Sequence, residues 1–408
     1  MKHEKIHVAC CICGGGPAGI MLGYLLARAG IKVAVLEKHK DFFRDFRGDT
    51  IHPSTIQLMY ELDLLGAFLK VPHQEIDHLT AQFNGVDVLV ADFKHLPVAK
   101  PILALMPQWD FLNFITAAAE KYSTFKLHRE TIATQLVKDN NEVRGIMATT
   151  PDGELEIIAD IVIGADGRNS IIRKLAGLRV IETGVPIDVL WFRLARQKGD
   201  PGQTFGRFEK GRIMVLLDRD EYWQCALVIA KGDYDNIKAA GLDAFRTEIE
   251  QITPFLAHHT EVLKSWDDIK LLSVAIDHLE KWYAPGLLCI GDAAHAMSPV
   301  GGVGINLAIQ DAVATANILY RSLAAGKTIT PAQLYAVQRR RQLPARLIQR
   351  VQVYVQNGMV KRRADIALSQ RMPLALKILK RFRILSRVPA RIVGMGVRPE
   401  HIRTPEVK

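Results

Sequence analysis

The first forty residues constrain the fold of this chain more than any other stretch. An apolar segment at residues 8–13 runs into the motif Gly14-x-Gly16-x-x-Gly19, a helical pattern follows, and a second apolar segment ends at Glu37. This order predicts a strand, a glycine turn, a helix, a second strand and a terminal carboxylate. The first two glycines allow a tight turn close to a pyrophosphate, and the third lets the helix pack on the strand. The helix N-terminus then presents free N–H groups to an anion.

The position of Glu37 strengthens this interpretation. It lies 23 residues beyond Gly14, close to the offset of about 20 expected for the carboxylate that takes a ribose hydroxyl pair. A glycine-rich turn in another α/β protein is the alternative for the glycines alone, but the ordered elements around them favour a dinucleotide site. NAD and FAD use the same pyrophosphate contacts, so this stretch leaves the choice between them open.

Length and composition indicate a globular protein with two domains. The chain has 408 residues, of which 49% are hydrophobic, enough for two separate cores. No apolar run approaches the roughly 18 residues of a spanning helix, and the N-terminal apolar segment leads into glycines rather than a cleavage site. We therefore expect a cytoplasmic protein, with the inner face of the membrane as an alternative location.

Three of the five cysteines, Cys10, Cys11 and Cys13, fall in the first predicted strand. Residues three apart on a strand face opposite sides about 10 Å from each other, beyond the roughly 7 Å that a disulfide tolerates. We interpret these cysteines as small buried apolar residues, with redox or metal chemistry as the alternative. No metal site is predicted.

The net charge of +10 is concentrated near the C-terminus. Residues 361–398 hold 11 Lys or Arg and one acid, Asp365, while the remaining 42 basic and 42 acidic residues balance. A generally basic nucleic-acid-binding surface is therefore not supported.

A second glycine turn follows the strand predicted at residues 154–163. There, Asp166-Gly167-Arg168 places a carboxylate at a strand end, with Ser170 and Arg173 at the start of the next helix. Two strands at residues 127–137 and 142–149 and a hairpin turn at residues 152–153 are expected before it.

A third glycine turn begins at Gly291-Asp292 after an apolar strand. A loop with Pro299, Gly301, Gly302 and Gly304 then leads to Ile305, Asn306 and a helix at residues 307–319. The loop repeats the chemistry of the opening, because backbone donors at a helix N-terminus face a polar group without side chains in the way. A tight turn capped by Asp292 is the alternative.

The stretches between these turns predict a second sheet. We expect a strand pair at residues 80–90, a connector at 97–107, a helix at 108–122, and antiparallel β-structure from 185 to about 268, including strands at 204–208, 212–218 and 222–230. This insertion would cover a substrate. Its aromatic residues serve either the core or the substrate: Trp191, Phe192, Phe205, Phe208, Tyr222 and Trp223.

Together the three turns resemble the class A flavoprotein monooxygenases, the aromatic hydroxylase family with the p-hydroxybenzoate hydroxylase fold. The glycine motif with Glu37 resembles the family's ADP-binding motif, Asp166-Gly167 its Asp-Gly motif, and Gly291-Asp292 its Gly-Asp motif. The resemblance covers about three-fifths of the chain. The candidate cofactor-binding residues are Gly14, Gly16, Pro17, Ala18, Gly19, Glu37, Lys38, Arg47, Gln108, Asp166, Gly167, Gly291, Asp292, Pro299, Gly301, Gly304, Ile305 and Asn306.

Two of these candidates, Arg47 and Gln108, are less specific. They stand where the family places polar contacts to the FAD pyrophosphate and ribityl chain, and Arg47 also suits an ordinary solvated loop. His295 directly follows the Gly-Asp turn and is a candidate general base, although a structural role explains it equally well. No other catalytic residue is identified, because the flavin would carry the chemistry.

The resemblance implies FAD as cofactor, NADPH or NADH as a transient electron donor, and oxygen transfer from a flavin C4a-hydroperoxide to an aromatic or polycyclic small molecule. No second dinucleotide motif is present, and the halogenases' Trp-x-Trp-x-Ile-Pro segment is missing. The alternatives are a flavin-dependent reductase or dehydrogenase, a membrane-surface hydroxylase of a quinone precursor, and a non-catalytic carrier. The sequence leaves the oligomeric state open.

The predicted architecture is a Rossmann-like α/β FAD-binding domain with an inserted antiparallel sheet and C-terminal helices. The FAD-binding domain comprises residues 1–79, 100–184 and 269–330, the substrate domain residues 80–99 and 185–268, and the basic helical region residues 331–408. A helix at 338–355 should be interrupted at Pro344. Residues 372–388 interleave apolar and basic side chains, which suits either a membrane interface or a packed helix, and the lack of a clean polar face favours the packed helix.

Overall fold

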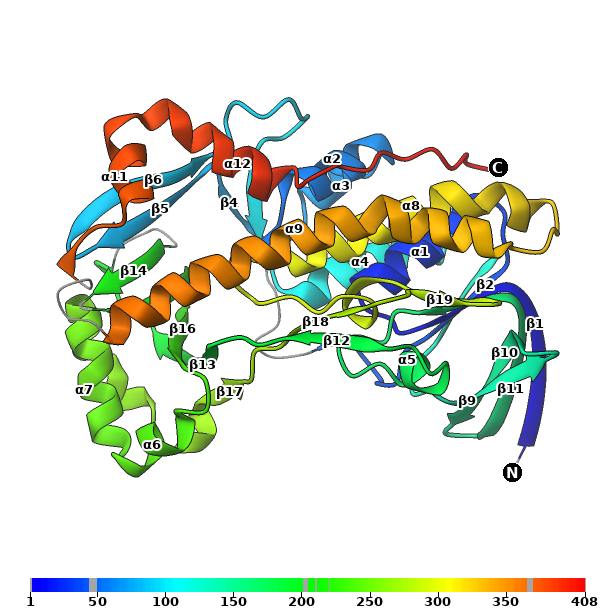
Figure 1. Cartoon of the computed structure of the whole chain (residues 1–408), viewed down its shortest axis with the longest axis horizontal. Helices are drawn as coiled ribbons and strands as arrows, with labels where there is room; N and C mark the ends of the chain where they lie inside the picture. The colour runs from blue at the N-terminus through cyan, green and yellow to red at the C-terminus, as the bar shows by residue number, and fades with distance from the viewer. Residues whose placement is uncertain are drawn as a thin grey trace.

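The computed structural model describes residues 2–43, 50–200, 205–209, 211–219, 221–364 and 370–407. Two sheets lie at opposite ends of the molecule, and a long helix, α9 (Pro331–Ala364), runs from one to the other (Figure 1). The predicted class, an α/β fold that combines a parallel sheet with an antiparallel one, is confirmed.

The first sheet has a parallel core whose strands end at the same level. Its order is β19-β20-β11-β1-β2-β8. Cys13 pairs with Gly164 across β1 and β11, and Gly164 pairs with Cys289 across β11 and β20. The three predicted glycine turns therefore leave the sheet at one edge, the carboxyl ends of its strands, where such folds bind ligands. These strands are β1 (Lys2–Cys13), β2 (Val33–Leu36), β8 (Phe125–His128), β11 (Gly153–Gly164), β19 (Tyr283–Ala284) and β20 (Leu287–Cys289).

The opening strand, turn, helix and strand form as predicted, with α1 (Pro17–Arg28) between β1 and β2. Cys10, Cys11 and Cys13 are free and buried within β1, which confirms that they serve as apolar core residues. Burial raises the pKa of the Cys10 thiol well above its ordinary value, so it stays protonated at neutral pH.

The antiparallel strands β9 (Ile132–Asp139) and β10 (Glu142–Thr150) extend this sheet beside β11. The single strand predicted at residues 127–137 is wrong, because this stretch belongs to two strands. β8 ends at His128 and β9 begins at Ile132. Glu130 between them has a left-handed φ of 51°, which ends the extended conformation.

Helices cover the parallel sheet. α1 packs against α4 (Gln108–Ala119) and α8 (Gly304–Ala324), and α8 packs against α9. The predicted interruption at Pro344 is wrong, because α9 continues through it. A proline removes one backbone hydrogen bond, and the helix is held around that position by side chains buried on one face, Arg341, Ala345 and Ile348.

The second sheet has the order β17-β13-β16-β15-β14-β5-β6, and the predicted meander and strand pair lie within it. Its strands are β5 (His78–Phe83), β6 (Val86–Asp92), β13 (Ile187–Ala195), β14 (Phe205–Glu209), β15 (Arg212–Asp218), β16 (Tyr222–Ala230) and β17 (Lys270–Leu272).

The prediction of antiparallel β-structure from residue 185 to about residue 268 is wrong for its last part. Residues 234–268 are helical instead: α6 (Tyr234–Ala239), α7 (Leu242–Ile252), η1 (Pro254–Leu256), η2 (Thr260–Val262) and η3 (Trp266–Asp268). α7 buries Phe245, Ile249 and Ile252, at helical spacing, in one core with the sheet. The helices thus cover one face of the second sheet.

Shorter elements complete the fold. They are β3 (Thr50–Ile51), α2 (Pro53–Glu61), α3 (Leu65–Phe68), β4 (Gln74–Ile76), β7 (Leu103–Leu105), α5 (Ile171–Leu175), β12 (Val180–Thr183), β18 (Ile276–Leu279) and η4 (Gly291–Ala293). β3, β7 and β4 form a small sheet, and β12 pairs with β18.

The basic C-terminal region forms α11 (Leu374–Arg381), η5 (Arg383–Ser386) and α12 (Arg387–Gly394), all in contact with β6. Residues 398–407 then run back past α2 and α3 to the far end of the molecule (Figure 1). Arg28 donates to the carbonyl of Thr404 at 3.1 Å, and Tyr122 donates to Glu406 at 2.8 Å. Among the described residues, no helix is long and apolar enough to cross a bilayer.

Candidate functional site

The first and second glycine turns touch each other at Gly14. This residue has a φ of +115°, and a Cβ atom there would lie 2.3 Å from the carbonyl oxygen of Ala165 and 2.7 Å from the backbone nitrogen of Asp166. Only glycine fits such a backbone approach. The first motif is therefore seated directly on the second, 150 residues away in the sequence.

The third turn is seated between two helices. Gly291, with a φ of +59°, would place a Cβ atom 3.2 Å from Ala18 in α1 and 3.2 Å from Ala308 in α8. The Gly291 N–H donates to the buried carboxylate of Asp311 at 3.1 Å. All three motifs thus meet at one edge of the parallel sheet.

The N-terminus of α1 is arranged as an anion site. Gly16 is its N-cap, no side chain caps it, and a Cβ atom on Gly16 would find nothing within 4 Å. Pro17 begins the helix with its fixed φ, which suits this position. A Cβ atom on Gly19 would lie 1.9 Å from the carbonyl oxygen of Gly14, so the helix packs on the turn only with glycine there. No side chain of the described residues thus takes up the first-turn donors of α1.

Glu37 closes the turn from the second strand. Its carboxylate accepts the N–H of Gly15 at 3.1 Å and that of His39 at 3.0 Å. A carboxylate oxygen can accept more than one hydrogen bond, so these two backbone contacts are compatible with a ribose hydroxyl at the same group. Lys38 follows it and is exposed.

Asp166 has a different environment from the one predicted for a cofactor contact. Its two oxygens accept the Ser170 hydroxyl at 2.5 Å and the N–H groups of Ile171 and Ile172 at 2.7 and 3.1 Å. Ser170 is the N-cap of α5, and the Asp166 side chain accepts the first two N–H groups of that helix. Gly167, with a φ of +82°, turns the chain between them.

Asp292 is only partly covered. Its side chain is 33% exposed, and Nη2 of Arg168, 32% exposed, lies 3.6 Å away. Nη1 of Arg168 is buried without a hydrogen-bond partner in the described part of the chain. Leaving a buried donor without an acceptor costs free energy. The Arg168 guanidinium is therefore suited to bind an anionic group of a ligand at this site. Its place after the Asp-Gly pair was the signal that could have identified it.

The loop before α8 is held by Asn306. The side-chain oxygen of Asn306 accepts from the His52 N–H at 2.9 Å and the Thr55 hydroxyl at 2.7 Å, while its nitrogen donates to the Thr50 carbonyl at 3.1 Å. This predicted cofactor residue therefore ties α8 to the start of α2. The three partners could not be identified from the sequence, because they lie about 250 residues away.

The other loop candidates surround the N-terminus of α8. Pro299 and Gly301 precede it, and Gly304 and Ile305 form its first turn, which has no side-chain cap. Gly301 has a φ of +83° and an added Cβ atom would meet only Val303, at 3.7 Å, so its surroundings remain open. A second uncapped helix N-terminus is thus part of the same edge.

His295 lies in a buried polar network. Its Nε2 atom lies 2.6 Å from Asp311, whose other oxygen accepts from Arg341 Nε at 2.9 Å, and all three side chains are buried. Burial by itself would raise the pKa of the Asp311 carboxyl group. His295 and Arg341 lower it by more than that, so the pKa of Asp311 lies below its ordinary value. The ring of Trp282 packs on that of His295 in a tilted arrangement, with the centroids 4.9 Å apart. This side chain is therefore enclosed in the core rather than exposed to a substrate.

Two predicted contacts remain less defined. Gln108 is the first residue of α4 and is half-buried. Arg47 lies outside the described residues. Among the described residues, no group of three or more His, Cys, Asp or Glu could hold a metal ion.

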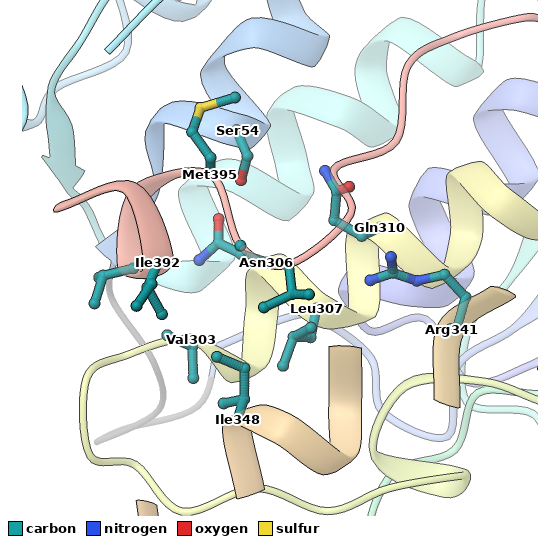
Figure 2. Close-up of a pocket in the computed structure, with 12 residues that line it drawn as sticks. Ser54, Val303, Asn306, Leu307, Gln310, Arg341, Ile348, Ile392 and Met395 are labelled. Atoms are coloured by element: carbon teal, nitrogen blue, oxygen red, sulfur yellow. The ribbon is translucent and has the colours of Figure 1, made fainter. Parts of the chain in front are cut away.

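A small apolar pocket lies behind the α8 N-terminus (Figure 2). Asn306, Leu307 and Gln310 from α8 face Ile348 of α9 and Ile392 of α12 across it. Most of its lining is apolar, and its polar members are Ser54, Asn306, Gln310 and Arg341. The side chains of Asn306 and Arg341 are hydrogen-bonded within the protein, whereas Nε2 of Gln310 is buried without a hydrogen-bond partner among the described residues. We interpret it as a packing gap between α8, α9 and α12.

The second sheet has an apolar cluster on the face that α7 does not cover. Val189, Trp191, Val215 and Val228 form an apolar cluster there, together with Val300 of the loop before α8. Two of the six aromatic candidates, Phe192 and Trp223, lie instead in the core beneath α7. Trp191 therefore marks the face that meets the glycine edge.

The residues present fit a flavin dinucleotide. Two uncapped helix N-termini, the open space at Gly16 and the unpartnered Arg168 donor suit an anionic pyrophosphate, and the Glu37 carboxylate suits a ribose. Among the positive-φ glycines of the third turn, Gly301 leaves room beside the backbone for a flat ring, whereas Gly302 is packed against Thr50.

Comparison with known proteins agrees with this geometry. The sequence profile of a family described as an FAD binding domain matches residues 7–350. The 6-methylpretetramide 4-monooxygenase of Streptomyces rimosus is 30% identical over 389 residues, which are 95% of this chain and 91% of that enzyme.

Other relatives are more distant. The rifampicin monooxygenase of Streptomyces venezuelae is 27% identical over 316 residues. The matched region is 74% of this chain and 61% of that enzyme. The structure of the anhydrotetracycline hydroxylase OxyS from Streptomyces rimosus superimposes with a TM-score of 0.76 at 20% identity, covering 96% of this chain and 77% of OxyS.

Proposed function

This chain belongs to the FAD binding domain family and is an FAD-dependent monooxygenase, and from that premise we propose that it hydroxylates an aromatic or polycyclic small molecule with electrons from NADPH or NADH. Bound FAD would supply the redox chemistry, by accepting a hydride and activating O₂. One oxygen atom enters the product and the other leaves as water.

The single observation that carries the substrate class is the apolar face around Trp191. It offers aliphatic and aromatic contacts without an ionic pair, and it meets Val300 next to the glycine loop. A flat, apolar ring system suits such a wall. The 6-methylpretetramide enzyme, which is similar along nearly the whole chain, is named for a polycyclic substrate.

The remaining residues of the site bind and orient. We propose that the α1 N-terminus with Gly16 and Arg168 hold the pyrophosphate and that Glu37 holds the ribose. Asn306 keeps the loop before α8 in place through α2. The His295–Asp311–Arg341 network fixes the turn that carries Asp292. None of these groups needs to move a proton to the substrate.

The test is NADPH and NADH oxidation by the purified holoenzyme against phenols, quinone precursors, polycyclic polyketides and antibiotics. We expect polycyclic phenolic compounds to stimulate flavin reduction and to gain one oxygen atom from isotopically labelled O₂. Unchanged product yield without O₂ would identify a reductase or dehydrogenase. Failure of both nicotinamides to reduce bound FAD would indicate a non-catalytic carrier.

A variant on the apolar face separates substrate binding from cofactor binding. Val215→Trp should raise KM for the bulkiest accepted substrate at least tenfold while leaving FAD content unchanged, because the added ring occupies the wall. Val262→Trp, at an exposed position of η2, is the matched control. Equal KM values for the two variants would place the substrate elsewhere.

A further inference from the structure

The segment from residue 371 to residue 396, here called the C-terminal arm, has a charge pattern unlike the rest of the chain. It contains seven Lys or Arg and no Asp or Glu. The arm comprises α11, η5 and α12 and packs on β6. Balanced surfaces carry both signs, so a segment with only cations is suited to an anionic partner.

α11 divides into an apolar side and a basic side. Leu376 and Leu379 are half-buried, whereas Leu374 and Ile378, one turn apart, are 72% and 41% exposed. Lys377 and Lys380 lie on the opposite side. The apolar face of α11 therefore extends beyond the part that the protein covers.

η5 and α12 repeat this arrangement. Ile384, Val388 and Ile392, spaced four residues apart, are 64%, 57% and 41% exposed. Arg387 and Arg391 flank them, also one turn apart, while Ala390 and Gly394 form the buried side. Two successive helical segments thus present an aliphatic stripe beside a basic stripe.

We propose that the C-terminal arm binds the surface of an anionic lipid membrane, with the aliphatic stripes in the interface and the cations on lipid phosphates. Large exposed aliphatic side chains interleaved with Lys and Arg are typical of interfacial helices, and each cation near an anionic surface adds attraction. No described helix could cross the bilayer, so the contact is peripheral. This proposal does not depend on the proposed substrate.

The occupant is a membrane rather than a second protein copy because the arm has no acid to pair with its own cations across a symmetric contact. A lipid surface has a phosphate layer above an apolar layer. The basic stripe can contact the phosphates while the aliphatic stripe beside it enters the apolar layer. The consequence is that the enzyme would work where apolar substrates accumulate.

The first experiment is flotation of the full-length holoenzyme with vesicles of phosphatidylcholine alone or with three parts in ten phosphatidylglycerol. We expect at least tenfold stronger partitioning to the anionic vesicles at low salt, and a reduced but measurable fraction at 0.5 M salt, because insertion resists screening. Equal partitioning to both compositions, or none to either, would overturn the proposal.

Variants separate insertion from simple charge attraction. The triple change Leu374→Ser, Ile384→Ser and Val388→Ser should cut anionic-vesicle partitioning about tenfold. Tyr354→Ser, at an 82% exposed position of α9, is the matched control and should change nothing. If the triple variant binds vesicles normally but loses concentration-dependent self-association, a second copy occupies the stripes and the proposal is wrong.

A label reports insertion without relying on those substitutions. All five natural cysteines are buried, so a polarity-sensitive dye can be attached selectively at Ile378→Cys or Lys380→Cys. The emission at residue 378 should shift to the blue on anionic vesicles, and that at residue 380 should shift little. Equal shifts at both positions would contradict the stripe orientation.

Discussion

Asp166 and Asp292 follow strands that lie side by side and end at the same level, and each stands beside a glycine in a turn, yet their side chains have different surroundings. Both carboxylate oxygens of Asp166 accept hydrogen bonds within the protein, from the Ser170 hydroxyl and from two backbone N–H groups of α5. Asp292 is one-third exposed and has Arg168 at 3.6 Å. The first holds the protein together, and the second is accessible to a ligand.

The same division separates the glycines of the first motif. Gly14 is pressed against the second turn, while Gly16 faces open space. A sequence motif therefore mixes positions required by the fold with positions required by the cofactor. Substitutions that affect one property and leave the other intact can separate them.

The largest effect is expected at Gly14. Gly14→Ala places a Cβ atom 2.3 Å from the Ala165 carbonyl at a φ of +115°, which should lower the free energy of unfolding by at least about 4 kcal/mol or prevent folding. Gly16→Ala, at a φ of −75° with nothing near, should change it by less than about 1 kcal/mol.

Urea denaturation of the apoprotein and FAD titration measure the two properties. Gly16→Ala should weaken FAD binding at least tenfold, because its new methyl group enters the space kept for the pyrophosphate. Comparable unfolding free energies for Gly14→Ala and Gly16→Ala would remove the distinction between the two positions.

Two buried histidines beside the α8 loop extend the comparison to pH. His295 has the Asp311 carboxylate as partner, whereas the His52 ring has backbone carbonyls beside it, that of Val393 at 2.7 Å from Nδ1 and that of Gly302. Burial lowers the pKa of His52 from 6.5 to about 4. The unfolded state binds more protons between these values, so stability is fully present above pH 6.5 and falls as pH drops toward 4, by up to about 3 kcal/mol.

His52→Asn keeps a donor for the Val393 carbonyl and removes the titration. Its unfolding free energy should therefore depend less on pH between 6.5 and 4 than that of the parent protein, as measured by urea denaturation at several pH values. His258→Asn, at an exposed position, should retain the parental profile. A parental slope in His52→Asn would assign the pH dependence to other groups.

The sequence predicts the turns because their chemistry is local, but it does not predict their partners. Strand, glycine, helix and acid are encoded within thirty residues, and α1 forms as expected. The commitment of Asn306 to Thr50, His52 and Thr55 depends on contacts across 250 residues.

The arm shows a second limit of local patterns. Residues 372–388 lack a clean polar face as one helix, because the helix ends at Arg381 and a new one starts at Arg387 in a different phase. Each piece alone separates apolar from basic side chains. Residues 234–268 are a different case: Phe245, Ile249 and Ile252 in α7 do have helical spacing, whereas α6, η1, η2 and η3 are too short to show a pattern.

A smaller effect distinguishes the two carboxylates. Asp166→Ala removes the acceptor of the first two N–H groups of α5, while Ser170 remains its N-cap, and should lower the free energy of unfolding by about 1–2 kcal/mol. Asp292→Ala should lower it by less than about 0.5 kcal/mol, since its ion pair is exposed, but should weaken FAD binding about tenfold. Thermal denaturation of the apoproteins measures the loss of stability, and flavin titration measures the loss of FAD binding. A larger loss of stability in Asp292→Ala, together with a larger loss of FAD binding in Asp166→Ala, would contradict the comparison.

The smallest effect is the coupling between Arg168 and Asp292. A double-mutant cycle with alanine at both positions should give a coupling below about 1 kcal/mol at low salt, and close to zero at 0.5 M salt, because both side chains are solvated. The corresponding cycle for Asp166 and Ser170, joined at 2.5 Å and part-buried, should give a larger and salt-insensitive coupling. A large salt-insensitive value for Arg168 and Asp292 would mean that Asp292, like Asp166, serves the fold, and its proposed contact with the cofactor would lose its support.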